Sequence, residues 1–308
     1  MAKRRTAKKS LSLTGIIIAV LFFAVSVFMD QAGLWDDALD AVSDGSASVS
    51  ADADEIILDT YFIDVGQGDS SLFISDNKSM LIDCGEKENA DTVIATLSET
   101  GVTKLDYAVV THAHSDHMGA MTDIIENIEI ENIIISEPCE KSSETASYER
   151  FIDAVTESGA NVILAQPDYT FSLGYAECRI LAPYEVSSNE NNNSIVMHIT
   201  AGETSFLMTG DAEKTVEKNI MKNYPDLTAT ILKTGHHGSS TSSYESFIEQ
   251  ISPETAIIQC GLNNSYGHPD EETLSVFNKL NITHYRSDIY GNIKISCTTD
   301  SYTLSTEN

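Results

Sequence analysis

One short segment constrains this chain more than any other. It reads THAHSDH over 111–117, so three of the chain's eight histidines and an aspartate lie within six residues, directly after an apolar run. Imidazole and carboxylate groups are ligands of zinc, manganese and iron, and core packing has no use for so much polar density. The i, i+2 spacing lets His112 and His114 point to one side of an extended loop. Asp116 and His117 then turn toward a second position as the next helix begins. The segment predicts a divalent metal centre at the end of a buried strand.

The rest of the chain alternates between strand-like and helix-like patterns. β-branched runs such as 105–110 predict strands, and a stretch closed by glycine such as 144–158 predicts a helix. Residues 118–127 predict a further helix directly after the histidine segment. No linker interrupts residues 55–300, so we expect one mixed α/β domain there, with residues 301–308 as a C-terminal tail.

Three more segments accompany the histidine motif. Asp83 ends the run LIDCG, Asp211 follows the apolar run in LMTGDA, and the pair His236-His237 lies in KTGHHGSS. Together with HxHxDH after a strand, these segments resemble the metallo-β-lactamase fold hydrolases. The resemblance implies an α/β protein with the four-layer αββα metallo-β-lactamase fold, in which Asp83 orients ligands and Asp211 bridges two ions.

Four further stretches narrow the resemblance. They are DVGQGDS at 64–70, NNNSIV at 191–196, GHHGSSTSS at 235–243 and NSYGHP at 264–269. They resemble the soluble metallo-β-lactamase-like domain of ComEC-type competence proteins and their stand-alone relatives, over residues 61 to about 296. A full competence protein has a multi-span channel region, whereas this sequence contains one long apolar segment.

The resemblance implies a site for one or two divalent ions, zinc or manganese. The implied ligands are His112, His114, Asp116, His117, Asp211, His236 and His237. His112 and His114 would share one ion with one histidine of the adjacent pair. Asp116 and His117 would hold the other ion, and Asp211 would bridge both, which makes the two aspartates the expected catalytic residues. A hydroxide bound between ions about 3.5–4 Å apart would be the nucleophile at neutral pH.

The sequence departs from the wider family in one loop. Many members carry a further histidine before the strand that leads to the bridging aspartate, but here the loop 188–194 has none. ComEC-type sequences lack it as well. Its absence leaves the second metal short of a ligand, and an oxygen-rich site would favour manganese. His237 aligns better with the last ligand because a glycine follows it, which makes His236 a neighbour or a phosphate contact; the reverse assignment stays open.

Other polar residues of the motifs are expected to orient ligands or to contact substrate. These are Asp64, Asp69, Asp83, Asn193, Ser194 and Lys233. Asp64 and Asp69 either hold ligating imidazoles through their second N–H or simply end strands. Lys233 is one of few basic residues in the later motifs, so phosphate recognition is sparse. His268 is either a turn residue or a third catalytic residue, as substrate contact or proton donor.

The first 54 residues differ in composition from the rest. Residues 11–29 are uncharged and mostly apolar, and as a helix they would span about 29 Å, which is enough to cross a bilayer core. Five Lys or Arg residues precede them and would stay in the cytoplasm, so the domain would lie outside. We expect residues 1–29 to be a transmembrane anchor, or else a cleaved signal peptide of a secreted protein. Residues 30–54 predict an acidic linker.

Acidic residues dominate the chain. It has 47 Asp and Glu against 18 Lys and Arg, a net charge of −29, and five of the basic residues precede residue 30. Such a body repels polyanions, so coating of duplex DNA is disfavoured, whereas a small or single-stranded phosphodiester held by metal charge fits. The five scattered cysteines predict buried thiols rather than a disulfide framework.

These patterns predict a metal-dependent hydrolase that acts on phosphodiesters outside the membrane, in the manner of a nuclease. A rival within enzymes is hydrolysis of another ester, a lactone or a phosphocholine-type group. A rival of another class is a DNA-uptake or binding module that keeps the fold without turnover. The intact histidine and aspartate motifs argue against that module, because a catalytically dead relative usually loses ligands. The sequence leaves the oligomeric state open.

Overall fold

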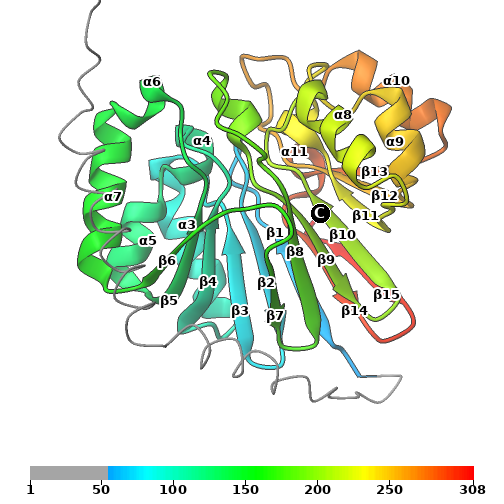
Figure 1. Cartoon of the computed structure of the whole chain (residues 1–308). Helices are drawn as coiled ribbons and strands as arrows, with labels where there is room; N and C mark the ends of the chain where they lie inside the picture. Colours follow the sequence, from blue (N-terminus) through cyan, green and yellow to red (C-terminus); the bar gives the residue numbers. More distant parts are fainter. Residues whose placement is uncertain (1–54) are drawn as a thin grey trace, which may run out of the picture. The chain divides into compact units, whose positions relative to one another are not determined.

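The computed structural model describes residues 55–308 (Figure 1). The expected anchor at 1–29 and linker at 30–54 lie outside the described residues, so both stay predictions. Over 55–308, none of the helices combines the length and the apolar character that a membrane crossing requires.

One layer of the domain is an eight-stranded sheet, in the order β15-β14-β1-β2-β3-β4-β5-β6. Its strands are β1 Leu58–Phe62, β2 Ser71–Ser75, β3 Lys78–Ile82, β4 Lys104–Val110, β5 Glu129–Ile135, β6 Asn161–Leu164, β14 Ile293–Cys297 and β15 Tyr302–Thr306. Neighbours from β3 to β6 run parallel, and the other neighbours run antiparallel. Parallel neighbours need crossover connections, which here carry helices.

The second layer is a seven-stranded sheet, in the order β13-β12-β11-β10-β9-β8-β7. Its strands are β7 Thr170–Leu173, β8 Ala176–Ala182, β9 Val196–Ala201, β10 Thr204–Met208, β11 Ile231–Lys233, β12 Thr255–Ile258 and β13 Thr283–Arg286. Strands β7 to β10 pair antiparallel, and β10 to β13 run parallel. Each half of the chain therefore begins with hairpins and continues with parallel strands.

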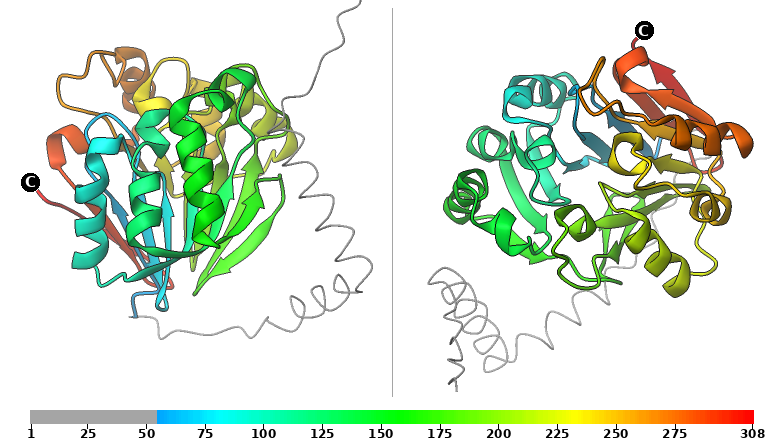
Figure 2. Two further views of the ribbon diagram at one scale, coloured as in Figure 1. Left: turned by 90° about the vertical axis from the view of Figure 1, so that its left-hand side faces the viewer. Right: turned by 90° about the horizontal axis from the view of Figure 1, so that it is seen from above.

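Helices cover the outer faces of both sheets (Figures 1 and 2). They are α3 Ala90–Glu99, α4 Ser115–Met118, α5 Met121–Asn127, α6 Glu140–Ser143, α7 Ala146–Ser158, α8 Lys214–Asn223, α9 Glu245–Ile251, α10 Glu271–Lys279 and α11 Ser287–Tyr290, with 3-10 turns η1 Lys87–Asn89, η2 Glu190–Asn193 and η3 Gly235–Gly238. Helices α3, α5 and α7 share an apolar cluster with the first sheet, and α8, α9 and α10 share one with the second. The predicted four-layer αββα fold is confirmed.

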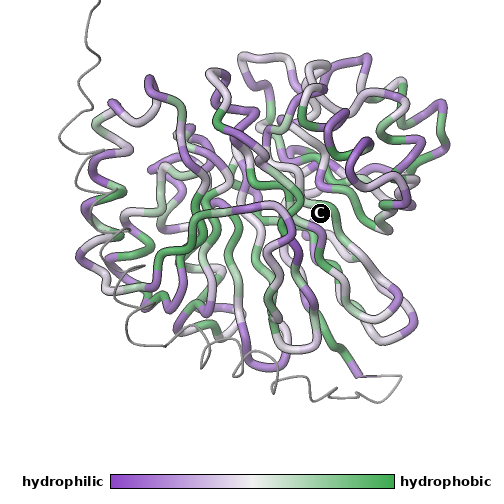
Figure 3. Tube along the Cα trace, in the orientation of Figure 1, coloured by the Kyte–Doolittle hydropathy of each residue, from purple (hydrophilic) through white to green (hydrophobic). Residues whose placement is uncertain are grey.

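A third apolar cluster fills the space between the two sheets. Phe73 of β2 meets Phe206 of β10 there edge to face, with ring centroids 5.6 Å apart. Figure 3 shows the apolar residues running along the central strands. Because a central parallel strand is buried on both faces, it reads as a continuous β-branched run rather than an alternating one.

Two sequence predictions about elements were wrong. The helix expected over 118–127 begins only at Met121, as α5, because the short helix α4 ends at Met118. At Gly119 between them, a Cβ would lie 2.7 Å from the backbone nitrogen of Lys87. The tail expected at 301–308 contains β15, which pairs along its whole length with β14. Its Tyr302 and Leu304 pack against the core between the sheets, while alternate residues face solvent.

The fold brings the polar motifs to one edge. Strands β3 and β4 of the first sheet are parallel and end just before Asp83 and the histidine segment. Strands β10 and β11 of the second sheet are also parallel and end just before Asp211 and the adjacent histidines. The carboxyl ends of both strand pairs therefore meet in one region.

Candidate metal centre

Asp83 holds the histidine segment in place. Its backbone has a positive φ of 57°, which directs the side chain back toward the end of β4. There Oδ1 accepts from the Thr111 backbone N–H at 2.8 Å, and Oδ2 accepts from the Thr111 hydroxyl at 2.7 Å. Oδ2 also lies 2.8 Å from Nδ1 of His117. A carboxylate can only accept, so the proton of a neutral His117 sits on Nδ1, and Nε2 presents a lone pair.

His237 is fixed in the same way. Its Nδ1 lies 3.0 Å from the carbonyl oxygen of Gln259 and 3.2 Å from Oδ1 of Asp69, and both atoms are acceptors. The Nε2 atom is therefore the lone-pair side of a neutral ring. It lies 3.2 Å from Oδ2 of Asp116 and 3.6 Å from Oδ1 of Asp211.

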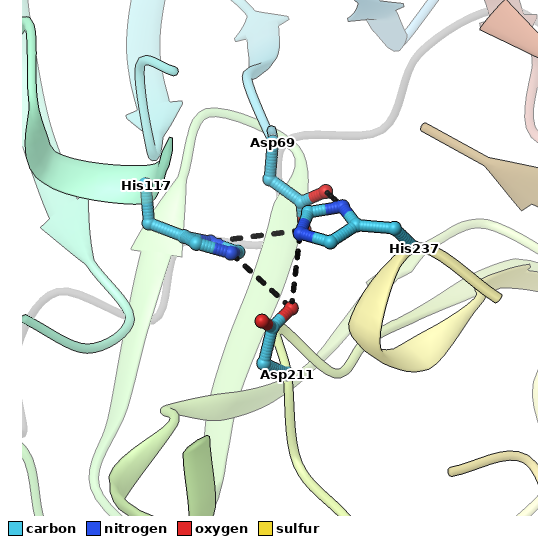
Figure 4. A group of neighbouring side chains, drawn as sticks. All are labelled: Asp69, His117, Asp211 and His237. Atoms are coloured by element: carbon cyan, nitrogen blue, oxygen red, sulfur yellow. Dashed lines mark ion pairs between the residues drawn. The ribbon is translucent and has the colours of Figure 1, made fainter. Parts of the chain in front are cut away.

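The first of two groups that could hold an ion consists of His117, His237, Asp211 and Asp69 (Figure 4). Asp116 is outside this group, although its Oδ2 lies 3.2 Å from Nε2 of His237. Nε2 of His117 lies 3.2 Å from Oδ1 of Asp211. Ligand atoms about 2.0–2.2 Å from one tetrahedral ion lie about 3.3–3.6 Å apart, and the distances from the two Nε2 atoms to Asp211, 3.2 and 3.6 Å, are close to that. The Asp69 carboxylate faces the Nδ1 atoms of His237 and His117, at 3.2 Å and 4.0 Å, so it lies behind the rings rather than on their Nε2 side.

The second group contains His112, His114 and the other oxygen of Asp211. Nε2 of His112 is 3.0 Å from Nδ1 of His114 and 3.8 Å from Oδ2 of Asp211. Nε2 of His236 reaches the same Oδ2 at 3.6 Å, but His236 is not a member of either group. With three protein ligands, this group leaves a coordination position for water or substrate, as catalytic sites do.

Asp211 thus lies between the two groups, with one carboxylate oxygen toward each. Its backbone N–H donates to Oγ of Ser194 at 3.0 Å, and the same Oγ lies 3.3 Å from Nδ1 of His112. The close contact of Gly210 with Thr111 and Ser194 lets this turn approach the histidine segment. The position expected for a bridging carboxylate is where the structure places Asp211.

Burial and charge act strongly on the groups of this site. Burial alone would lower the pKa of His237, but the carboxylates of Asp211 and Asp69 raise it to about 10. Burial likewise opposes a charge on His117, yet Asp211 and Asp83 raise its pKa well above the ordinary value. The surroundings therefore stabilise positive charge where the two rings face Asp211.

The remaining ligands respond to the same field. Burial disfavours ionisation of Asp211 and Asp116, but His117 outweighs burial and lowers the pKa of both carboxyls. Burial, with the charge on His117, lowers the pKa of His112 well below its usual range. His112 is therefore neutral and can ligate through its lone pair.

Several buried atoms of this site have no hydrogen bond. They include Nε2 of His117, Nε2 of His237 and Oδ1 of Asp211. Two lone-pair nitrogens and a carboxylate oxygen that face one another without a proton or cation would repel. The donor set, imidazole nitrogen with carboxylate oxygen, is that of zinc, manganese or iron sites. These residues therefore fit a divalent metal ion.

Lys233 lies behind the first group rather than in a substrate pocket. Its side chain is 1% exposed, and Nζ lies 2.7 Å from Oδ2 of Asp69 and 2.9 Å from the carbonyl oxygen of Thr234. Of the two expectations for Lys233, the structure favours support of the ligands over contact with substrate, because the side chain is buried against Asp69. Of the two readings for Asp69, the structure places it beside ligating imidazoles. Burial raises the pKa of Asp69, but Lys233 and His237 outweigh this and lower it.

Asp64 and Asn193 are not beside the metal ligands. Oδ1 of Asp64 accepts from the Gly66 backbone N–H at 3.0 Å, so it shapes the turn at the end of its strand. Asn193 is buried and joins Ser187 to Glu190 within the η2 loop. Glu190 was missed by the sequence analysis. Its carboxylate accepts from the Ala113 and Cys139 backbone N–H groups and so holds the histidine segment from outside.

His268 lies beside the site. Its ring centroid is 5.5 Å from that of His236 and 6.4 Å from that of His237, and its Nδ1 is buried without a hydrogen bond. Burial and the two neighbouring imidazoles lower its pKa, which keeps the ring neutral at pH 7. The cysteines at 84, 139, 178, 260 and 297 are all free and buried, as expected.

A cavity of about 440 Å³ opens beside His114. Hydroxyl and amide side chains line it, among them Ser142, Thr145 and Asn189, together with Lys141. The cavity lies next to the second group, the one with three protein ligands.

Residues 63–261 match the family model described as metallo-beta-lactamase superfamily. The chain is 30% identical over 256 residues to ComE operon protein 3 of Bacillus subtilis, covering 75% of this chain and 32% of the relative. It is 30% identical over 233 residues to Competence protein ComA of Neisseria gonorrhoeae, covering 74% of this chain and 30% of the relative. The chain thus spans about a third of the length of these curated relatives.

Two solved structures support the fold. The metallo-beta-lactamase fold protein YhfI from Bacillus subtilis aligns with a TM-score of 0.51 and 15% identity, over 80% of this chain and all of that one. CmlA, a diiron beta-hydroxylase from Streptomyces venezuelae, aligns with a TM-score of 0.52 and 12% identity, over 79% of this chain and 54% of that one. At these identities the likeness concerns the fold alone.

Proposed function

Since the chain belongs to the metallo-beta-lactamase superfamily, we propose that it is a metal-dependent hydrolase that cleaves phosphodiester bonds of single-stranded or small substrates. One observation carries the proposal. Asp211 directs one carboxylate oxygen to each of two groups of ligand atoms, and the atoms of the first group are buried and without hydrogen bonds. Two adjacent divalent ions would supply Lewis acidity and an activated water at neutral pH.

The chain's own residues prepare that chemistry. Asp83 and the Gln259 carbonyl hold protons on the Nδ1 atoms of His117 and His237, so that both Nε2 atoms can ligate. The hydroxyl of Ser194 accepts a hydrogen bond from the Asp211 backbone N–H and so positions Asp211. His268, neutral and beside His236, is placed to hydrogen-bond a bound substrate or its leaving group.

The phosphodiester class is supported by the cavity beside His114. Its hydroxyl and amide groups can donate hydrogen bonds to phosphate oxygens, and Lys141 adds a positive charge. The strong net negative charge of the chain disfavours a long duplex. Relatives named for competence, and one named Recombination protein 2 in Haemophilus influenzae, are consistent with a nucleic-acid strand as substrate.

We also propose that the domain acts outside the cytoplasmic membrane, anchored by residues 11–29. The support is the uncharged apolar stretch with its preceding basic residues. Fractionation of cells, with an intact-mass measurement of the protein, tests this proposal. A protein shorter by about thirty residues and free of the membrane would instead indicate a cleaved signal peptide.

Hydrolysis of bis(p-nitrophenyl) phosphate tests the activity. The full chain, purified in detergent, is assayed metal-free and then with Mn²⁺ and with Zn²⁺. We expect metal-dependent turnover that Asp211→Asn abolishes. Asp106→Asn is the matched control, because Asp106 is equally buried but accepts from Lys78 and Ser79, away from the site, so turnover should survive.

The outcomes separate the rival functions. Turnover of p-nitrophenyl esters or lactones without phosphodiester cleavage would move the substrate class to those compounds. Stoichiometric metal without any turnover would favour a binding module. Loss of activity in both aspartate variants would mean that the assay reports on folding rather than on the site.

A further inference from the structure

The loop between β12 and α10 exposes two large apolar side chains. Leu262 is 72% exposed and Tyr266 is 69% exposed, and both lie in the segment 261–270. Single exposed apolar residues are ordinary on a protein surface. Two of them within five positions, on a loop that borders the candidate metal centre, are a feature that folding does not require.

The exposure of Tyr266 does not come from a loosely held loop. Nδ2 of Asn264 donates to the carbonyl oxygens of Gly261 at 2.9 Å and His268 at 2.6 Å, and its Oδ1 accepts from the His268 backbone N–H at 3.0 Å. The start of the loop is tied to the first motif, since the Gly261 N–H donates to Oε1 of Gln67 at 3.2 Å. One asparagine thus fixes both ends of the turn that presents the tyrosine.

The tyrosine ring continues a row of rings that leads to the metal centre. It stacks on His268 with ring centroids 5.7 Å apart and ring planes 22° from parallel. The His268 ring in turn lies 5.5 Å from the ring of His236, whose Nε2 is 3.6 Å from Oδ2 of Asp211. His268 stacks against Tyr266, yet 69% of the tyrosine stays exposed, which leaves ring surface for a flat ligand.

The side chains of the loop indicate what kind of ligand it can bind. Residues 261–270 contain no lysine or arginine and end in Asp270, so this loop offers no charge to a phosphate. What it offers is an aromatic face, on which any nucleobase can stack regardless of sequence. Because the chain is strongly acidic, affinity for a strand beyond the metal ions has to come largely from such uncharged contacts.

Resting on the proposed function, we infer that Tyr266 is a stacking platform for a nucleobase of a single-stranded substrate, adjacent to the phosphodiester that is cleaved. The substrate class is thereby narrowed from phosphodiesters in general to those that carry a base. Leu262 extends the apolar surface of the same loop. Tyr266 is a specificity residue, and it does not touch the reacting atoms.

Two strands of equal length and charge test the inference. One is a single-stranded oligothymidylate, and the other carries abasic sites in place of the bases. Binding to the full chain with Mn²⁺ is measured by fluorescence anisotropy at times too short for cleavage, as a gel of the same samples verifies, and cleavage is measured separately. Stacking contributes about 1–3 kcal/mol per base, so Tyr266→Ala should weaken thymidylate binding by about 5- to 150-fold. Abasic binding should stay unchanged.

Two variants complete the design. Tyr266→Phe keeps the ring and should keep the preference for bases. Tyr169→Ala removes another exposed tyrosine, one that contacts Phe171 of β7 rather than a site residue, and should have no effect. The inference would be overturned if Tyr266→Ala lost affinity equally for both strands, or if the unaltered chain bound both strands equally well. Base-dependent binding without cleavage would leave the platform intact and refute the proposed hydrolysis instead.

Discussion

The buried pair of Lys233 and Asp69 allows a quantitative test of how the metal centre is supported. The two side chains are 1% and 6% exposed, and Nζ lies 2.7 Å from Oδ2. Removing one partner of a buried pair leaves an uncompensated charge and costs about 3–5 kcal/mol. Lys233→Met keeps most of the side-chain volume, so the loss of charge dominates. We expect the free energy of unfolding to fall by that amount.

The assays are urea unfolding and thermal unfolding of the metal-free protein, both followed by circular dichroism in EDTA. For a domain of this size, a change of about 3–5 kcal/mol lowers Tm by about 6–20 °C. The matched control is Lys78→Met. Lys78 is paired with Asp106 at 2.6 Å, and its side chain is 50% exposed against 4% for that of Asp106. The Ser79 backbone N–H still donates to this carboxylate, so the variant should lose less stability than Lys233→Met.

The same pair should also govern metal affinity. Asp69 touches Nδ1 of His237, and partners that orient a ligating histidine typically affect metal affinity about 10- to 100-fold. Zinc titration should show this loss for Lys233→Met and not for Lys78→Met. In the double variant with Asp69→Asn, part of the stability should return, since both charges are gone. Equal costs for the two lysine variants, or strict additivity in the double variant, would refute the reasoning.

Three further outcomes are expected. Burial raises the pKa of Glu217 to about 8 from its ordinary 4.5. The stability that this carboxyl contributes is therefore full below about pH 4.5 and is lost as pH rises toward 8, by up to about 1.4 kcal/mol per pH unit. In urea melts, Glu217→Gln should gain stability relative to the unaltered chain at pH 8 but not at pH 4.5. Gly68→Ala should abolish metal binding in calorimetry, because its Cβ would collide with the carbonyl of Asp116 at a φ of +150°; unchanged binding would mean that the loop can shift. Deleting 301–308 should cost several kcal/mol in urea melts, since β15 pairs along β14 and covers the core, and an unaltered midpoint would contradict its role in the fold.

The sequence predicts which residues lie at the metal centre better than it predicts how they divide between the two groups of ligand atoms. Histidines and aspartates at the ends of buried strands are recognisable by type and spacing alone. Which adjacent histidine joins which group depends on the backbone instead. His236 and His237 both adopt positive φ, 49° and 54°, and this sends their rings to opposite oxygens of Asp211. His237 therefore lies with His117 and Asp211 in the first group rather than with the first two histidines of the segment.

Long-range partners were beyond prediction for a different reason. Lys233 is a charged residue beside a ligand motif, and its burial against Asp69 follows only from the packing of one sheet on the other. Glu190 lies in a polar stretch with no periodic pattern, yet its carboxylate satisfies two backbone donors on separate segments. The final strand, β15, was missed because an edge strand with one face in solvent shows little apolar content.

Gln259 shows why the metal centre and the packing of the two halves depend on each other. It follows β12 of the second sheet, and its Nε2 donates to the carbonyl oxygens of Ile63 and Ser70 in the first β-hairpin, while its Oε1 accepts from Ser71. Its own carbonyl oxygen orients His237. A shift between the halves would therefore move a ligand, and an ion that binds that ligand must stabilise the packing. Metal affinity and the free energy of unfolding are coupled by mass action through this residue.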